Sequence, residues 1–195
     1  MPTLCNTTYK CVGDKKEIQS LYNLIQQMEK SEKPIIEDEF GNMWLGNLVN
    51  LLGADWNQYC CRGKITFYLL EDNVLTIEQE TAWFEQKEIR ELIKNIFPSI
   101  KVYFTDENFD DYYFSTNDKD GIYCKHRYFI DSSEDGFMEF DDIDSLAEFV
   151  SEMTESKINA DLTEIKATIA EYTDKMEEAG DDSFYCNFYE YQIVD

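Results

Sequence analysis

Residues 3–30 read TLCNTTYKCVGDKKEIQSLYNLIQQMEK, and this stretch decides the fold. Its first ten residues are rich in Thr, Tyr, Val and Cys, a composition that predicts a strand. Gly13 and Asp14 form a turn, and Asp14 with Glu17 three residues later is the pattern of a capping box. Apolar side chains then recur at helical spacing, at Ile18, Leu21, Ile25 and Met28. The stretch therefore predicts a strand followed by a helix that runs to about residue 30.

The same kinds of pattern continue between residues 64 and 105. Residues 64–70 and 74–81 predict two strands joined by a turn. Residues 86–97 carry apolar side chains at helical spacing and predict a second helix that stops before Pro98. Residues 100–105 predict one more strand. The order strand, helix, two strands, helix, strand is the split βαβ arrangement of ferredoxin-like folds.

Residues 32–62 interrupt this order. Pro34 ends the helical region, and residues 40–53 contain a short predicted helix. We expect an insertion after the first helix, which packs Trp44 and Trp56 on the core.

A second set of elements is predicted from residue 112 onwards. They are a hairpin of strands 112–114 and 122–130 around the turn 118–121, a strand over 136–140, helices over 141–153 and 159–178, and an aromatic strand over 184–194. On the last strand, Phe184, Cys186 and Phe188 are expected in the core. On its other face Tyr185, Tyr189 and Tyr191 form either a second buried layer or a surface for a partner.

These elements predict an α+β protein. We expect a ferredoxin-like βαββαβ core over residues 1–111, with the insertion at about 32–62. Residues 112–195 are expected to form an acidic C-terminal α/β extension that packs as one unit with the core. Of the 195 residues 43% are hydrophobic and 15% aromatic, which is typical of a folded chain rather than a disordered one.

The cellular compartment follows from features that the sequence lacks. The first residues have no charged segment followed by an apolar run, so no secretory signal is predicted. No stretch approaches the roughly 18 apolar residues of a membrane span. The 6 cysteines are therefore expected to be reduced thiols in a cytoplasmic protein.

The charge of the chain is its most unusual property. The chain has 41 acidic and 17 basic residues, a net charge of -24, and 26 of the acids but only 6 of the bases lie from Thr105 onwards. Repulsion from phosphate groups argues against direct binding of nucleic acid and of anionic membranes. A negative surface of this kind predicts a basic partner.

The acids that we expect on this surface are concentrated in the second half of the chain. Asp144, Glu148 and Glu152 are spaced by four residues and form one row, about 6 Å apart, along a predicted helix. The complete predicted partner-binding set is Asp106, Glu107, Asp110, Asp111, Asp118, Asp120, Asp141, Asp142, Asp144, Glu148, Glu152, Glu164, Glu171, Asp174 and Glu178.

Catalytic and metal-binding motifs are weak by comparison. Asp118 to Gly121 partly resembles a calcium loop but lacks the bidentate acid at its last position, so a turn is the better interpretation. His126 and Cys124 would share a face of a strand, but a half-exposed strand histidine explains the pattern better than a nucleophilic pair. We expect no enzyme activity, no cofactor and no metal site.

Two segments carry a family resemblance. The opening MPTLCN, leading through Val12-Gly13 into Lys16-Glu17-Ile18, and Thr81-Ala82-Trp83 before a helix and Phe97-Pro98, resemble the YubB-type ferredoxin-like proteins. Thr3 and Leu4 depart from that family's opening, and the prolines usual after Trp83 are missing. The resemblance covers about residues 1–130. It implies the ferredoxin-like topology and a plasmid or phage context, and no activity.

Three hypotheses of function remain at this point. The first is a non-enzymatic accessory protein of a mobile element, which binds a basic host defence or nucleic-acid-handling protein as a nucleic-acid mimic. The second is a generic interaction or structural module whose acidity serves solubility only. The third is a hydrolase or thiol enzyme that uses Cys124 and His126.

Overall fold

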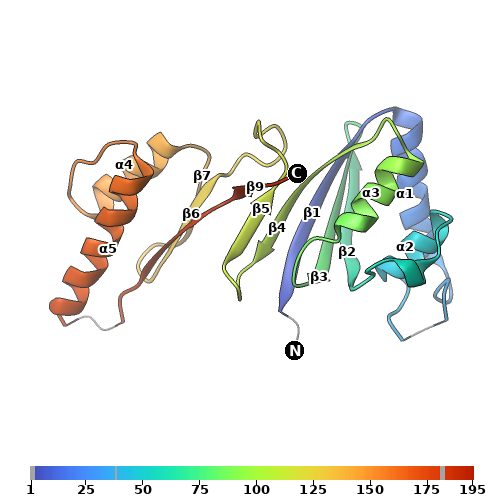
Figure 1. Ribbon diagram of the computed structural model, residues 1–195, viewed down its shortest axis with the longest axis horizontal. Helices are drawn as coiled ribbons and strands as arrows, with labels where there is room; N and C mark the ends of the chain where they lie inside the picture. Colours follow the sequence, from blue (N-terminus) through green and yellow to red (C-terminus); the bar gives the residue numbers. More distant parts are fainter. Residues whose placement is uncertain (1–2, 38, 181–182) are drawn as a thin grey trace. The chain divides into compact units, whose positions relative to one another are not determined.

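The computed structural model describes residues 3–37, 39–180 and 183–195, and they form a mixed α+β fold in two compact units (Figure 1). Unit 1 comprises Met1–Lys119 and Ile193–Asp195, and unit 2 comprises Asp120–Gln192. The division lies eight residues later than the predicted boundary after residue 111. The last three residues belong to unit 1, which the sequence did not indicate.

Unit 1 is built on one sheet with the strand order β2-β3-β1-β4-β5-β9. The central strands are β1 (Leu4–Val12), β3 (Val74–Ala82) and β4 (Lys101–Asn108), and β2 (Gly63–Glu71) forms one edge. All pairs from β2 to β5 (Tyr113–Thr116) are antiparallel. The two-residue strand β9 (Gln192–Ile193) follows β5, and the Val194 amide donates to the Thr116 carbonyl at 2.9 Å.

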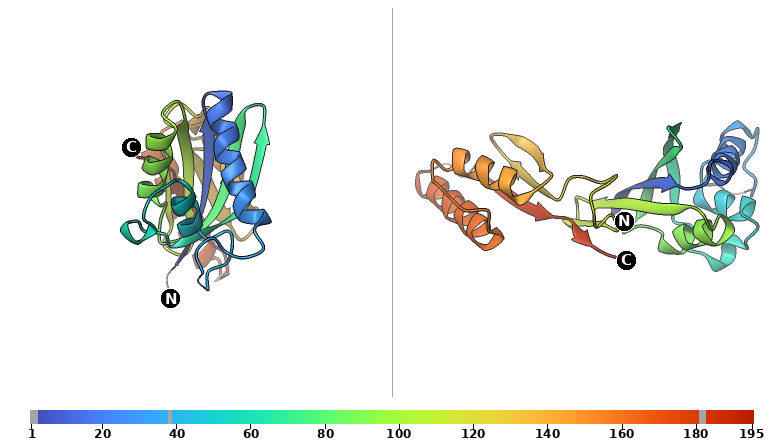
Figure 2. Two further views of the ribbon diagram at one scale, coloured as in Figure 1. Left: turned by 90° about the vertical axis from the view of Figure 1, so that its right-hand side faces the viewer. Right: turned by 90° about the horizontal axis from the view of Figure 1, so that it is seen from above.

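Three helices cover one face of this sheet, α1 (Lys15–Lys30), α2 (Leu45–Leu51) and α3 (Lys87–Ile96) (Figure 2, left). Every second residue of β1 is buried beneath them, as the alternation of a half-buried strand requires. The apolar stripe of α1 is buried as predicted, with Ile18, Leu21, Ile25 and Met28 in one core with the sheet. The strands and helices predicted up to residue 105 are all present.

The start of α1 is fixed to the loop before β4. Asp14 caps the helix, since its side chain accepts from the Lys16 amide at 2.8 Å. Glu17 does not close the predicted capping box, because its carboxylate accepts from the amide and the hydroxyl of Ser99, at 2.9 and 2.7 Å. Gly13 permits this approach, since a Cβ atom there would lie 2.7 Å from the Ser99 carbonyl oxygen.

The expected insertion between α1 and β2 is present. It contains α2, the short helix predicted within residues 40–53, and the 3-10 helix η1 (Trp56–Gln58). Trp44 is buried and Trp56 packs against the same core, with their ring centroids 5.2 Å apart. The prediction that this segment packs both indoles on the core is therefore confirmed.

The predicted hairpin of strands 112–114 and 122–130 is wrong. Strand β5 instead pairs with β4, and residues 122–127 form no strand. The side chain of Asn117 gives the physical reason. Its oxygen accepts from the Phe104 amide and its nitrogen donates to the Val102 carbonyl, both at 2.8 Å, which continues the pairing along β4. The chain then leaves for unit 2 instead of turning back.

Unit 2 has a three-stranded antiparallel sheet in the order β7-β6-β8, formed by β6 (Tyr128–Ser132), β7 (Gly136–Phe140) and β8 (Cys186–Glu190). Helices α4 (Ile143–Met153) and α5 (Leu162–Glu178) pack on each other and on this sheet. Their shared core contains Ile130, Leu146, Val150, Ile165 and Ile169.

Aromatic side chains form a second layer in unit 2. Phe129 is buried, and its ring centroid lies 4.8 Å from that of Tyr189 and 5.9 Å from that of Tyr191. Phe184 and Cys186 are buried in the helix-side core, and Phe188 packs against it. The expected two faces of the last strand are therefore present, although Tyr185 is exposed.

Candidate functional site

Helix α4 carries a row of exposed acids. Asp144, Glu148 and Glu152 are all exposed, and the helix buries the opposite side, with Leu146 and Val150 in the core. No basic residue lies in its last turn. The predicted row is therefore present on the outer side of α4.

Helix α5 adds a second row. Glu171, Asp174 and Glu178 are exposed, and Ile165 and Ile169 lie on the buried side. Helices α4 and α5 lie side by side (Figures 1 and 2). Because they bury their apolar sides in the same core, the two exposed rows lie on the outer side of one helical layer. We call Asp144, Glu148, Glu152, Glu171, Asp174 and Glu178 the acidic helical surface.

Few basic residues accompany the acids of this surface, and on α5 Lys175 lies in the last turn. Residues 120–192 contain 20 acidic and 5 basic residues. In unit 2, His126 forms ion pairs with Glu139 and Asp141, at 3.4 and 2.8 Å, and Lys166 forms one with Glu190 at 3.5 Å. None of these acids belongs to the acidic helical surface.

Two acids predicted on the partner-binding surface are buried. Asp106 and Asp118 are each 1% exposed and cannot contact a partner. Asp106 lies on the helix-covered face of β4, where one oxygen accepts from the Thr7 hydroxyl at 2.7 Å and the Cys5 thiol at 3.0 Å. Its other oxygen accepts from the Glu85 amide at 2.8 Å. The carboxylate thus organises the interior of unit 1.

The remaining predicted acids have varied positions. In unit 1, Glu107 is half-buried, Asp110 is exposed, and Asp111 is exposed and accepts from the Thr3 hydroxyl at 2.7 Å. In unit 2, Asp120 is exposed, Asp141 contacts His126, and Glu164 is half-buried and accepts from the Asn159 side chain at 2.9 Å. Asp142 caps α4 by accepting from the Ser145 amide at 2.8 Å, and this bond lowers the pKa of its carboxyl group.

The polar interior of unit 1 contains a hydrogen-bonded cluster around Glu85 and Asp106. Tyr9 donates to Glu85 at 2.6 Å, and Arg90 donates to the same carboxylate oxygen at 2.8 Å. Burial, and the negative charges of Asp106 and Glu85, raise the pKa of the Cys5 thiol and of the Tyr9 phenol. Both groups therefore stay protonated at neutral pH and serve as hydrogen-bond donors.

The proposed pairing of Cys124 with His126 loses its basis. Residues 122–127 are not a strand, so the argument that the two side chains share a face no longer applies. Cys124 is buried, whereas His126 is exposed and contacts Asp141 and Glu139. In the part of the chain that the structure describes, no group of three or more His, Cys, Asp or Glu side chains is placed to hold a metal ion.

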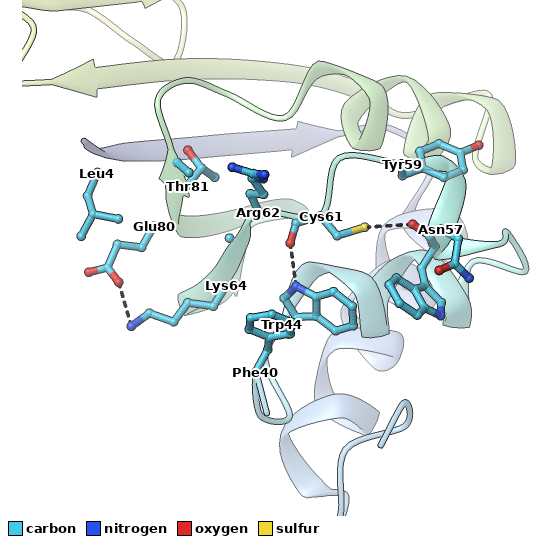
Figure 3. A pocket seen from close by; sticks show the side chains of 13 residues that line it. Leu4, Phe40, Trp44, Asn57, Tyr59, Cys61, Arg62, Lys64, Glu80 and Thr81 are labelled. Carbon is cyan, nitrogen blue, oxygen red and sulfur yellow. Dashed lines mark hydrogen bonds and ion pairs between the residues drawn. The ribbon is translucent and has the colours of Figure 1, made fainter. Parts of the chain in front are cut away.

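An aromatic pocket in unit 1 was not predicted. It encloses about 530 Å³ where the insertion meets β2 and β3 (Figure 3). Its lining residues are Leu4, Phe40, Trp44, Trp56, Asn57, Tyr59, Cys61, Arg62, Gly63, Lys64, Glu80, Thr81 and Ala82. The sequence of the insertion carries no local signal for the pocket, because the pocket depends on how two distant segments meet.

The Trp44 indole forms a fixed wall of this pocket. Its Nε1 donates to the Cys61 carbonyl oxygen at 2.6 Å, and the Phe40 ring lies 5.0 Å from it, between centroids. Gly46 lets the indole lie flat against the start of α2, since a Cβ atom there would come within 2.3 Å of the ring. The orientation of the indole is therefore set before any ligand arrives.

Two basic residues, Arg62 and Lys64, also line the pocket (Figure 3). The Lys64 ammonium contacts Glu80 at 2.7 Å, and the Arg62 guanidinium carbon lies 4.7 Å from the ring centroid of Trp83. Trp83 has a left-handed backbone with φ of 71°, a conformation that costs a non-glycine residue about 1–3 kcal/mol. Its amide donates to the Thr3 carbonyl at 2.9 Å, and its carbonyl accepts from the Asn108 side chain at 3.1 Å. These bonds hold the indole beneath Arg62.

No protein-family model, no curated protein and no solved structure matches this chain. Among the described residues, no helix is both long enough and apolar enough to cross a lipid bilayer.

Proposed function

We propose that the acidic helical surface of unit 2 binds a basic macromolecule, most specifically a protein whose own ligand is nucleic acid. The observation that carries this proposal is the absence of basic partners for the six exposed acids within the described part of unit 2. Uncompensated charge of one sign attracts a partner of the opposite sign over distances of about a Debye length. A folded array of carboxylates therefore competes with phosphates for such a partner.

The arrangement on α4 supports this proposal. Neighbouring acids are four residues apart, so about 6 Å separates their positions along the helix axis. Each like-charged pair at this spacing destabilises the helix by about 0.2–0.5 kcal/mol. The two pairs, Asp144 with Glu148 and Glu148 with Glu152, thus have a cost in stability. A function in binding accounts for that cost.

For unit 1 we propose a ferredoxin-like core. The order β2-β3-β1-β4 and the helices after β1 and β3 support this classification. A ferredoxin-like core agrees with the resemblance to YubB-type proteins, and with it we propose a mobile-element context. In that context the basic partner is a host defence or nucleic-acid-handling protein, and the chain acts as a non-enzymatic inhibitor in the cytoplasm.

Charge reversal on α4 tests the proposed function. The variant carries Asp144→Lys, Glu148→Lys and Glu152→Lys, and its control carries Glu32→Lys, Glu71→Lys and Glu78→Lys, three exposed acids of unit 1. Both variants change the net charge by the same amount. Each protein is immobilised and exposed to a bacterial lysate at low salt, and the bound proteins are then eluted with double-stranded DNA.

The unmodified protein and the control should retain nucleic-acid-binding proteins that DNA elutes, and the α4 variant should lose them. Added salt should weaken the retention steeply, since it screens exposed charges. Equal retention by all three proteins would contradict the proposal. That result would favour the alternative, an interaction or structural module whose acidity serves solubility.

A further inference from the structure

We propose that the aromatic pocket of unit 1 binds a small planar molecule that joins an aromatic ring to an acidic group, such as an aromatic carboxylate. The proposal concerns a different unit from the acidic helical surface and does not depend on it. It gives a role to the insertion between α1 and β2, which supplies Phe40, Trp44 and Trp56 to the pocket.

The size and the walls of the pocket favour a flat apolar ring. About 530 Å³ lies within the range of pockets that hold small molecules. Phe40 is 65% exposed, although it packs against the Trp44 indole. A ring that enters the pocket would cover Phe40 and stack on side chains that are already positioned.

Three polar groups of the walls are already paired within the protein. The Trp44 indole nitrogen already donates to Cys61, and the Asn57 amide donates to Asp55 at 2.9 Å. The Thr81 hydroxyl donates to the Phe84 carbonyl at 3.1 Å. A polar group of a ligand loses its hydrogen bonds to water when it is buried in the pocket, and these paired wall groups do not replace them. The walls thus select for an apolar body.

Arg62 supplies the specificity for an acid. Lys64 is paired with Glu80, but Arg62 contacts no carboxylate among the residues that the structure describes, even though the chain has 41 acids. Its guanidinium rests on the Trp83 ring beside the pocket. A planar guanidinium of this kind binds a carboxylate through two parallel hydrogen bonds. We therefore place the ring against Trp44 and Phe40 and the acidic group at Arg62.

Titration calorimetry with 2-naphthoate and its uncharged analogue 2-naphthalenemethanol tests this assignment. The full chain should bind 2-naphthoate with a sub-millimolar Kd and the alcohol about five- to tenfold more weakly. Arg62→Gln should weaken naphthoate binding to the level of the alcohol and leave the alcohol unchanged. Phe40→Ala should weaken both ligands by about fivefold, because both rings lose the same contact.

Two controls separate the pocket from general effects. Lys101→Gln removes an equal charge from an exposed position on β4, and Phe84→Ala removes a ring that is 58% exposed and does not line this pocket. Neither should change either Kd, and far-UV circular dichroism should show all variants folded. The proposal is overturned if 2-naphthoate does not bind at millimolar concentration, or if Phe40→Ala leaves its Kd unchanged. Equal weakening by Arg62→Gln and Lys101→Gln would also overturn it.

Discussion

Asp106 and Asp144 are the same residue type with opposite roles. Asp106 is buried and accepts hydrogen bonds from Thr7, Cys5 and Glu85, whereas Asp144 is exposed on α4. The sequence contained the signal for this difference. On a strand Asp106 shares a face with Val102 and Phe104, both of which are core residues. The acidic composition of the segment instead favours an exposed position for Asp106, which is why the prediction placed it on the partner-binding surface.

Removing the carboxylate of Asp106 should therefore destabilise unit 1. Asp106→Ala leaves the Thr7 hydroxyl and the Glu85 amide without their acceptor, so we expect a loss of about 2–4 kcal/mol in the free energy of unfolding. Asp110→Ala, at an exposed position two residues beyond β4, should change it by no more than about 0.5 kcal/mol. Urea denaturation measures both variants. A similar small effect for the two would contradict the role given to Asp106.

At the scale of the elements, the sequence predicted the helices and strands whose caps, turns and apolar patterns all lie within one short segment of the chain. Helix α1 has a cap, an apolar stripe and a stop within 18 residues; its N-cap Asp14 and its stripe are as predicted, whereas Glu17 does not close the capping box. The hairpin after β5 was wrong because Asn117 uses its side chain to extend the pairing with β4, a contact that no local pattern encodes. The aromatic pocket was missed for the same reason. Contacts between distant segments decide both features.

Two acids at the start of α4, Asp142 and Asp144, offer a test of capping. Asp142 accepts from the Ser145 amide, which lowers the pKa of its carboxyl group below the ordinary value of 3.8. A group with a lowered pKa in the folded state contributes stability above its ordinary pKa and loses that contribution as the pH falls. Asp142→Ala should therefore lower the Tm at pH 7, and the difference from the unmodified protein should shrink below about pH 4.

Asp144→Ala is the matched control, since this neighbouring side chain is exposed and caps no helix. Its effect on the Tm at pH 7 should be much smaller than that of Asp142→Ala. Thermal unfolding followed by circular dichroism between pH 2.5 and pH 7 measures both. An effect of Asp142→Ala that stays constant over this range would show that the charge of the carboxylate does not act in capping.

At the scale of the whole molecule, charge is distributed unevenly between the units. Unit 2 carries 20 acids and 5 bases, and the rest of the chain carries 21 acids and 12 bases. Composition predicted this asymmetry from Thr105 onwards. It did not predict which acids are buried, because burial depends on strand direction and packing rather than on the number of charges.

Self-repulsion on this scale should make the stability depend on salt. Raising sodium chloride from about 20 mM to 0.5 M shortens the Debye length and screens the exposed acids. We expect an increase in stability of order 1 kcal/mol, or about 2–4 °C in Tm. The variant with three lysines on α4 should gain less, because it carries less repulsion at low salt. A Tm that falls with added salt, or an equal gain for both proteins, would contradict this account.

The return of the chain to β9 has a consequence for how the molecule could be assembled and taken apart. Unit 2 lies between Lys119 and Ile193 in the sequence, and the strand that follows it completes the sheet of unit 1. Because unit 2 is one continuous segment between two segments of unit 1, a single in-frame insertion into the gene for unit 1 would add it and leave the order of the unit 1 strands unchanged. In proteolytic terms, a nick between residues 119 and 120 leaves the two fragments joined by non-covalent contacts, among them the pairing of β9 with β5, because residues 193–195 stay covalently attached to unit 2.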